Sequence, residues 1–443
     1  MKKIMVKSVA LVLALLTVIG LGACTRAKIQ SGVITPAPDG EAIDISGTIK
    51  FSYSGGTNEE SRGAANAFIE AFNKKYPNVQ VQRDYSNTDP STRISSGDIG
   101  DVFYFAEVSA YNYAITQNAL MPLEYYANAY GVDRGDVYSG IYDSGVINGH
   151  LYYVARDFNQ ILFIYNVDAI EQKGLTSRIV PEWTWDEFLA ICEEITDDDY
   201  YGATINLPYA PVFIPFLEAY NGRGRWFNTA TKTVDFTSGD TLKAVKEAVD
   251  ACQKGILNLS VSGGTGDFGS KESVFNYLVY PSILNTGNNY DNKKVKWDLI
   301  NLPLFEHAAF GAGSSGWGVY NRTKNPNAAA AFALYFYTAE GQRAYNGQSG
   351  GSVPLLASLK EDLFWRHPND DWSDKNWDAC VYKSEDYATV GQFACLLPAE
   401  ISDLLTMSAL TDIISRALSG KTSIEDGFAA LETKCNQKWA TLQ

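Results

Sequence analysis

The stretch Gly145–Asp168 decides the fold, and it reads GVINGHLYYVARDFNQILFIYNVD. Asn148-Gly149 favours a turn, and the apolar runs Leu151–Ala155 and Ile161–Tyr165 predict two strands. Between these runs lies a short polar window with an arginine, an aspartate, an asparagine and a glutamine. Two buried strands around a polar window are unusual within one core. Such a pattern is expected where a chain leaves one lobe and enters another. We therefore interpret the stretch as a crossover that forms the floor of a ligand cleft.

The chain before this stretch begins with a strand, a helix and a second strand. Residues 48–53 alternate apolar and polar side chains, a helix with an apolar stripe ends at Pro77, and residues 79–85 predict the next strand. This order predicts a parallel sheet, in which ligands bind at the carboxyl ends of the strands. The loop at 54–58 and the end of a strand at 101–105 lie at such an edge.

The chain after this stretch predicts a second α/β unit. Thr184 and Glu187 match a capping box, in which a hydroxyl and a carboxylate satisfy backbone amides at the start of a helix. Further helices are expected at 240–254, 327–345, 399–418 and 423–439, and further strands at 296–304 and 317–320. A length of 443 residues also suits two domains better than one core.

Composition and motifs argue against several functions. The net charge of -15 argues against nucleic acid or an anionic membrane surface as a partner. Residues 347–351 fit the G-x-S-x-G hydrolase motif, but a helix precedes the serine and a strand follows it, the reverse of what that motif needs. His150, His307 and His367 are far apart, so we expect no metal site and no cofactor. A glycosidase pair of carboxylates stays open, because such pairs come from distant strands.

The N-terminus combines three lysines with the apolar run 9–23, which is too short to span a membrane and predicts a secretory signal peptide over residues 1–23. The run ends in Leu-Gly-Ala-Cys24, which looks like the lipobox of bacterial lipoproteins; a chance cysteine is the alternative. The lipobox implies that Cys24 is lipidated, with acyl chains such as palmitate that anchor the protein on the extracytoplasmic face of the cell membrane. Residues 24–46 then form a flexible tether.

Five further cysteines are an odd number, so at least one is unpaired within the chain. Cys192, Cys252 and Cys435 lie on apolar faces of predicted helices, which favours buried thiols. A disulfide between Cys380 and Cys395 stays open.

A series of segments between residues 47 and 440 points to one known family. The segments are, in chain order, FSYSGG followed by AFNKKYPNVQV, GDIGDVFYF followed by NALMPLEYY, GHLYYVA with ILFIYNVDAIEQKGL, PEWTWDEF, FGSKESVF, LINLPLF followed by GAGSSGWGVYN, AAAAFALYFYTAEGQRAYN followed by GGSVPL, and LSGKTSIEDGFAAL. In this order, and with the lipobox, they resemble the family 1 extracellular solute-binding proteins of ABC importers, which include maltodextrin- and sugar-binding lipoproteins.

The resemblance implies an α/β, two-lobed periplasmic-binding-protein-like fold whose lobes close on a ligand by a hinge motion. It places hinge crossings near 155–160, 308–312 and 352–356. Lobe one is expected at 47–157 plus 311–353, and lobe two at 158–310 plus 354–443. The family usually has Gly-x-Pro where this chain has Val154-Ala155-Arg156, which puts a guanidinium near the cleft floor and would favour an acidic ligand group.

Sugar sites combine aromatic faces with planar polar groups, because a pyranose has an apolar C–H face and a rim of hydroxyls. The candidate ligand-binding residues are Tyr53, Ser54, Asn58, Tyr104, Phe105, Arg156, Asn159, Tyr209, Trp226, Tyr280, Ser314 and Trp317. For Tyr209 and Tyr280 the choice rests on the resemblance, which matches them to a cleft-facing segment and a ligand-stacking position.

Each candidate also has a purely structural interpretation. Tyr104 and Phe105 would suit a core, and Arg156 and Asn159 would suit an inter-lobe salt bridge or a hinge hydrogen bond. Trp226 would suit a cover over its lobe. The loop with Trp365, Trp372 and Trp377 would either form one wall of a site for a longer glycan or pack on lobe two.

The resemblance implies a monomeric, lipid-anchored binding protein, not an enzyme, that captures a mono- or oligosaccharide and delivers it to the transmembrane subunits of an ABC permease. The alternatives are a ligand-sensing lipoprotein that signals to a membrane receptor and a glycan-acting enzyme.

Overall fold

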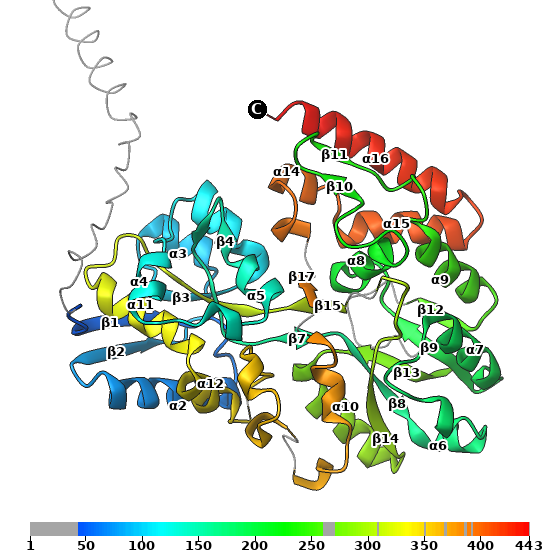
Figure 1. Ribbon diagram of the computed structural model, residues 1–443, viewed down its shortest axis with the longest axis horizontal. Coiled ribbons are helices and arrows are strands. Elements are labelled where there is room, and N and C mark those ends of the chain that lie inside the picture. Colours follow the sequence, from blue (N-terminus) through cyan, green and yellow to red (C-terminus); the bar gives the residue numbers. More distant parts are fainter. Residues whose placement is uncertain are drawn as a thin grey trace, which may run out of the picture. The chain divides into compact units, whose positions relative to one another are not determined.

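The computed structural model describes residues 43–259, 271–307, 310–349, 351–366, 370–384, 388–390 and 393–442. The predicted signal peptide, the lipobox with Cys24 and most of the tether lie outside the described residues. Within them, the longer strands form two five-stranded sheets, each covered by helices (Figure 1).

The first sheet has the strand order β2-β1-β3-β16-β6. Its strands are β1 (Gly47–Ser52), β2 (Val79–Asp84), β3 (Val102–Ala106), β6 (Val154–Ala155) and β16 (Ser315–Val319). β1 runs parallel to β2 and β3, so the parallel start predicted from the strand–helix–strand pattern is confirmed. β16 returns antiparallel between β3 and β6.

Helix α2 (Glu59–Lys75) joins β1 to β2, and Asn58 caps it by accepting a hydrogen bond from the Ser61 amide at 2.8 Å. Its stripe of buried residues includes Phe68 and Phe72, which pack on Phe332 of α11 (Pro326–Leu334). Helix α12 (Ala339–Asn346) lies beside α2 (Figure 1).

The helix predicted over 327–345 is wrong as a single element. α11 ends at Leu334, and Thr338 adopts extended backbone and caps α12 by accepting from the Gly341 amide at 3.1 Å. A side chain at Gly341 would meet the Tyr335 carbonyl oxygen at 2.0 Å, so the glycine permits this tight break. The helix predicted over 399–418 is also two, α14 (Ala399–Ser402) and α15 (Met407–Leu418).

The second sheet has the strand order β12-β9-β13-β8-β14. Its strands are β8 (Leu162–Asn166), β9 (Tyr200–Ile205), β12 (Leu257–Leu259), β13 (Glu272–Leu278) and β14 (Trp297–Asn301). β9 is parallel to β12 and β13, and β8 is antiparallel to β13 and β14. The helices α7 (Trp185–Ile195), α8 (Ala210–Glu218), α9 (Lys243–Gln253) and α16 (Ile424–Ala440) bury apolar faces in the same core.

The predicted capping box is confirmed, since Thr184 and Glu187 exchange side-chain and backbone hydrogen bonds at the start of α7. The predicted burial of Cys192 and Cys435 is confirmed, and Cys252 is half-buried.

Other elements are α3 (Pro90–Ser96), η2 (Glu107–Ser109), η3 (Asn112–Thr116), α4 (Glu124–Ala129), η4 (Arg134–Asp136), α5 (Ser139–Ser144), α6 (Val167–Gln172), η5 (Thr176–Arg178), the hairpin β10 (Phe227–Asn228) with β11 (Thr233–Val234), α10 (Tyr280–Lys293), and the short helical turns η6 (Tyr335–Tyr337), η7 (Ala357–Leu359), η8 (Leu363–Trp365), η9 (Asp370–Trp372), η10 (Trp377–Cys380) and η11 (Phe393–Cys395).

The opening stretch is more broken than its pattern predicts. The run 151–155 is not one strand, because β5 (His150–Leu151) turns back on β4 (Val146–Ile147) while β6 joins the first sheet. A side chain at Gly145 would meet the Tyr153 carbonyl oxygen at 2.3 Å, so this close approach requires glycine.

The three segments predicted as crossings lie side by side. β7 (Asn159–Gln160) pairs antiparallel with β15 (Phe310–Gly313), which pairs parallel with β17 (Ala388–Val390). The amide of Phe158 donates to the Val353 carbonyl oxygen at 3.0 Å. The polar window is therefore where distant parts of the chain meet, while the predicted lobe boundaries stay a prediction.

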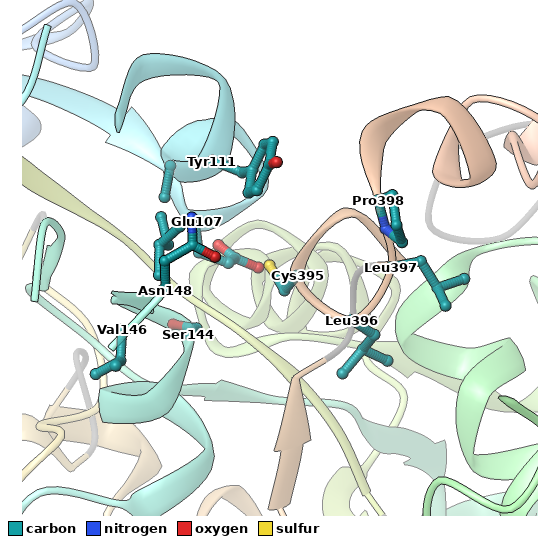
Figure 2. Close-up of a pocket in the computed structure, with 11 residues that line it drawn as sticks. Glu107, Tyr111, Ser144, Val146, Asn148, Cys395, Leu396, Leu397 and Pro398 are labelled. Carbon is teal, nitrogen blue, oxygen red and sulfur yellow. The ribbon is translucent and has the colours of Figure 1, made fainter. Parts of the chain in front are cut away.

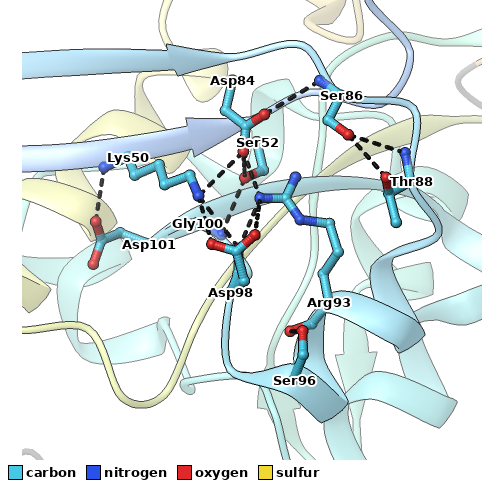
Figure 3. Close-up of polar contacts among 10 residues, drawn as sticks. All are labelled: Lys50, Ser52, Asp84, Ser86, Thr88, Arg93, Ser96, Asp98, Gly100 and Asp101. Carbon is cyan, nitrogen blue, oxygen red and sulfur yellow. Dashed lines mark hydrogen bonds and ion pairs between the residues drawn. The ribbon is translucent and has the colours of Figure 1, made fainter.

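An ion pair between a buried arginine and a partly buried aspartate holds the edge of the first sheet (Figure 3). The Arg93 guanidinium, 6% exposed, donates to Asp84 at 2.5 Å and to the Asp98 carbonyl oxygen at 2.7 Å. Ser52 also donates to Asp84, at 3.1 Å. Burial opposes ionisation of Asp84, but the hydrogen bonds from Arg93 and its other donors lower the pKa of Asp84 to about 2.

We expect Asp84→Asn to lower the free energy of unfolding at pH 7 by about 2 kcal/mol, because a pKa about two units below its ordinary value is worth that much. The pKa is lowered in the folded state, so this stability is present above pH 4 and is lost as pH falls toward 2. Urea unfolding at pH 7 and pH 2.5 should show a gap between wild type and variant that closes at the lower pH. A gap of equal size at both pH values would contradict the prediction. Asp98→Asn is the control, since that carboxylate is 73% exposed and should change stability by less than about 1 kcal/mol.

Candidate functional site

Three tyrosines surround one arginine at the carboxyl ends of β1 and β3. The guanidinium carbon of Arg156 lies 5.8 Å from the ring centre of Tyr53 and 5.2 Å from those of Tyr104 and Tyr345. Tyr53 directly follows β1, Tyr104 lies in β3, Arg156 follows β6, and Tyr345 belongs to α12. We call these four residues and Asp157 the arginine cluster. The fold brings them together because β1, β3 and β6 share one sheet.

Hydrogen bonds fix the orientation of the guanidinium. Nη1 of Arg156 donates to the hydroxyl of Tyr53 at 2.6 Å and to that of Tyr345, and Nε donates to Asp157 at 2.9 Å. The two tyrosine hydroxyls also share a hydrogen bond of 2.9 Å. Nη2 has no hydrogen bond to another described residue. Burial raises the pKa of Asp157, and the nearby Arg156 opposes that rise.

The backbone at Ser314 and Ser315, where β15 leads into β16, touches two buried carboxylates. The amide of Ser315 donates to Asp157 and the amide of Ser314 donates to Glu107, each at 3.1 Å. Tyr153 and Ser314 share a hydrogen bond of 2.8 Å. Glu107 is only 5% exposed, and burial raises its pKa to about 8.

Glu107 also lines a cavity of about 300 Å³ (Figure 2). Tyr111, Ser144 and Asn148 line it from the part of the chain that carries the first sheet, and residues 395–398 line it opposite Tyr111. The η11 turn packs on η2, which begins with Glu107. None of the twelve candidate residues lines this cavity. The signal that would have found Glu107 is its place directly after the strand at 101–105, at the edge where ligands bind.

Several other candidates lie close to this site. Trp317 is fully buried, and its ring centre is 5.3 Å from that of Tyr53 and 5.5 Å from that of Tyr104. Phe105 is buried and packs on Tyr153. Ser54 is half-buried in the loop after Tyr53, and Ser314 is buried and contacts Glu107 and Tyr153.

Asn58 and Asn159 use their side chains within the fold. Asn58 is exposed and caps α2, while Asn159 accepts a hydrogen bond from the Ser352 hydroxyl at 2.7 Å. The Asn159 contact joins two of the predicted crossings, as in the hinge hydrogen bond considered for it.

The candidates from the second α/β unit are spread out. Tyr209 precedes α8, and burial, with Glu107 nearby, raises its pKa to about 12. Tyr280 begins α10, is buried and donates to the Trp365 carbonyl oxygen. Trp226 is fully buried against Phe236 and Phe393. Tyr209 is thus beside the site, while Tyr280 and Trp226 contact other parts of the chain; all twelve stay predictions as ligand contacts.

The aromatic loop and the cysteines are also placed. Trp365, Trp372 and Trp377 are buried, and Trp372 donates to Asp291 of α10 at 2.8 Å. Cys380 and Cys395 are both free, so a disulfide between them is wrong: Cys380 is buried in η10, whereas Cys395 lines the cavity beside Glu107.

The arrangement suits non-covalent binding of a polar solute, because it offers aromatic rings, a guanidinium and carboxylates side by side. Among the described residues, no group of three or more histidines, cysteines or acidic residues is placed to hold a metal ion. No described helix combines the length and hydropathy needed to cross a membrane.

Comparison with solved structures supports the same architecture. An ABC substrate-binding protein from Listeria monocytogenes in complex with cycloalternan has a TM-score of 0.68 and 18% identity, covering 89% of this chain and 99% of that chain. The sugar-binding protein MalE from Xanthomonas citri has a TM-score of 0.71 and 16% identity, covering 89% and 98%. UgpB from Mycobacterium tuberculosis in complex with glycerophosphocholine has a TM-score of 0.68 and 16% identity, covering 89% and 99%. The predicted two-lobed α/β fold is thereby confirmed.

Comparison with sequences gives the family. A search of curated proteins found no match. The model of the bacterial extracellular solute-binding protein family matches residues 56–343. This family and the structural neighbours are binding proteins rather than enzymes. The chain therefore belongs to the bacterial extracellular solute-binding proteins.

Proposed function

We propose that this protein is a lipid-anchored, monomeric solute-binding protein that captures a mono- or oligosaccharide and delivers it to the transmembrane subunits of an ABC permease. The arginine cluster carries the proposal: the half-buried ring of Tyr104 can stack on a pyranose face, and it lies beside a guanidinium that can donate to the sugar hydroxyls.

Two of the three structural neighbours support a carbohydrate as the solute. The Listeria monocytogenes protein was solved with cycloalternan, and the Xanthomonas citri protein is described as sugar-binding. The ligand contacts proposed first are Tyr53, Tyr104 and Arg156, because they share one sheet edge.

The anchor is proposed from the lipobox at Cys24, and it would hold the protein on the outer face of the cytoplasmic membrane. Incorporation of a palmitate analogue that is lost in Cys24→Ser is the direct measurement. The proposed lobes, 47–157 plus 311–353 and 158–310 plus 354–443, would close over the solute about the crossing segments.

Titration of intrinsic tryptophan fluorescence with a panel of sugars tests the solute class, since Trp317 lies beside Tyr53 and Tyr104. We expect at least one sugar to shift the signal. In Tyr104→Ala the affinity should fall by about 1–2 kcal/mol, or roughly tenfold, because a stacking face and its contact with Arg156 are lost. Tyr201→Ala is the matched control, because Tyr201 lies at the amino end of β9 and should leave affinity unchanged. If peptides or anions shift the signal and no sugar does, the carbohydrate proposal fails.

A further inference from the structure

The region around Ser314 and Ser315 holds two carboxyl groups but one guanidinium. Two buried carboxylates, Glu107 and Asp157, accept hydrogen bonds from these consecutive amides. The one guanidinium in the cluster, Arg156, is committed to Asp157 at 2.9 Å. Among the described residues, Glu107 forms no ion pair. When all three groups are ionised, one negative charge is therefore left over, and it belongs to Glu107.

Among the described residues, the charged group that shifts the pKa of Glu107 is an acid, Asp157. The described titratable groups that interact with it electrostatically are Asp157 after β6, Tyr153 before β6, Tyr209 before α8 and Cys395 of η11. All four are acids. Burial among them raises the pKa of Glu107 to about 8, so we expect the unliganded protein to hold a proton on this side chain at pH 6.5.

Of the two carboxyl groups, Glu107 is the one that lines a cavity. It lines the cavity of about 300 Å³, whose other polar lining includes Tyr111, Ser144 and Asn148, whereas Asp157 is fully buried and does not line it. A volume of this size lies at the lower end of the range for small-molecule sites. A nine-tenths buried carboxyl group without a cation, at the wall of such a cavity, is a site for a donor that brings positive charge.

We propose that Glu107 binds a protonated amine of the solute, so that this protein prefers an amino sugar to the neutral sugar of the same shape. The inference rests on the proposed function, because it specifies the carbohydrate that the site would take. The ammonium group supplies the missing cation, and its charge favours the ionised form of Glu107. Binding of the amine at pH 6.5 then transfers the proton of Glu107 to the buffer, whereas binding of a neutral sugar releases no proton.

Isothermal titration calorimetry at pH 6.5 tests this, with glucosamine, galactosamine and mannosamine each compared with its N-acetylated form. We expect at least one amine to bind tenfold or more tightly than its acetylated partner. Repeating the titration in two buffers of different ionisation enthalpy should show release of close to one proton for the amine and none for the acetylated sugar. The proton count uses the wild-type protein and needs no variant.

Glu107→Gln keeps an acceptor for the Ser314 amide but removes the charge. In this variant the preference for the amine and the proton release should both disappear. Glu194→Gln, at an exposed ion pair on α7, is the control and should change neither readout. If neutral sugars bind as tightly as amines, or if amines bind without proton release, the role of Glu107 is overturned while the proposed function stands. If no sugar of either kind binds, the carbohydrate function fails and this inference fails with it.

Discussion

Arg156→Ala is expected to lower the free energy of unfolding by about 3–5 kcal/mol, because it leaves the buried Asp157 without its cation. Asp157 is fully buried, and the donors that remain to it are the Ser315 amide at 3.1 Å and the side chain of Asn159. The hydroxyls of Tyr53 and Tyr345 keep the hydrogen bond that they share, so they account for less of the loss. Urea unfolding followed by circular dichroism measures the effect.

The loss in this variant should depend on pH with a definite sign. The pKa of Asp157 is already raised in the folded wild type, and removal of Arg156 takes away the opposing charge. A carboxyl group with a raised folded-state pKa favours the folded protein below its unfolded pKa, and this advantage is lost as pH rises through the folded pKa. The variant should therefore be closest to wild type near pH 4 and furthest from it at pH 8.

A double variant separates charge burial from packing. Arg156→Met with Asp157→Asn removes both charges, and it should lose less stability than the single alanine variant because no ion is left unpaired. Solute affinity of folded Arg156→Ala should also fall, by about 1.5–3 kcal/mol for a charged hydrogen bond. A stability loss under about 1 kcal/mol that does not vary with pH would contradict the role given to this ion pair.

Gly311→Ala is the second substitution with a large expected effect. A Cβ atom at Gly311 would lie 1.5 Å from the carbonyl oxygen of Pro211, so α8 and β15 must move apart to accept it. Overpacking of this kind costs about 3 kcal/mol, since neither partner is a flexible side chain. The shift would also disturb the pairing of β15 with β7, which joins two crossing segments.

Gly63→Ala is the matched control for Gly311. Gly63 is exposed within α2, and a Cβ atom there meets no other atom within 4 Å. The same chemical change should stabilise this helix by about 1 kcal/mol, because alanine loses less backbone entropy than glycine. The midpoint of urea unfolding should move down for Gly311→Ala and up for Gly63→Ala. An unchanged midpoint for Gly311→Ala would show that α8 and β15 are not packed as closely as described.

Local sequence patterns predicted the parts of this protein that short-range forces determine. The alternation over 48–53 and the capping box of Thr184 and Glu187 each involve neighbours in the chain, and both predictions are confirmed. The ordered segments, each of which is short, also led to the correct family. Their order along the chain carried information that no single segment holds.

The breaks within elements were harder to predict, because they depend on packing from elsewhere. The alanine-rich pattern over 327–345 continues through the position where Thr338 ends one helix and caps the next. The stop reflects the close approach of Gly341 to the Tyr335 carbonyl oxygen.

The sequence by itself determined the types of the main elements, the family and the polar window at Arg156. Only the tertiary structure decided what that window touches, since Arg156 bonds to Tyr345 across 189 residues. It also placed Glu107 against Cys395 at one cavity, where no ion pair joins Glu107 to another described residue. Such contacts depend on which strands pair and how helices pack over them, and hydrophobic periodicity records only which face of an element is buried, not what it is buried against.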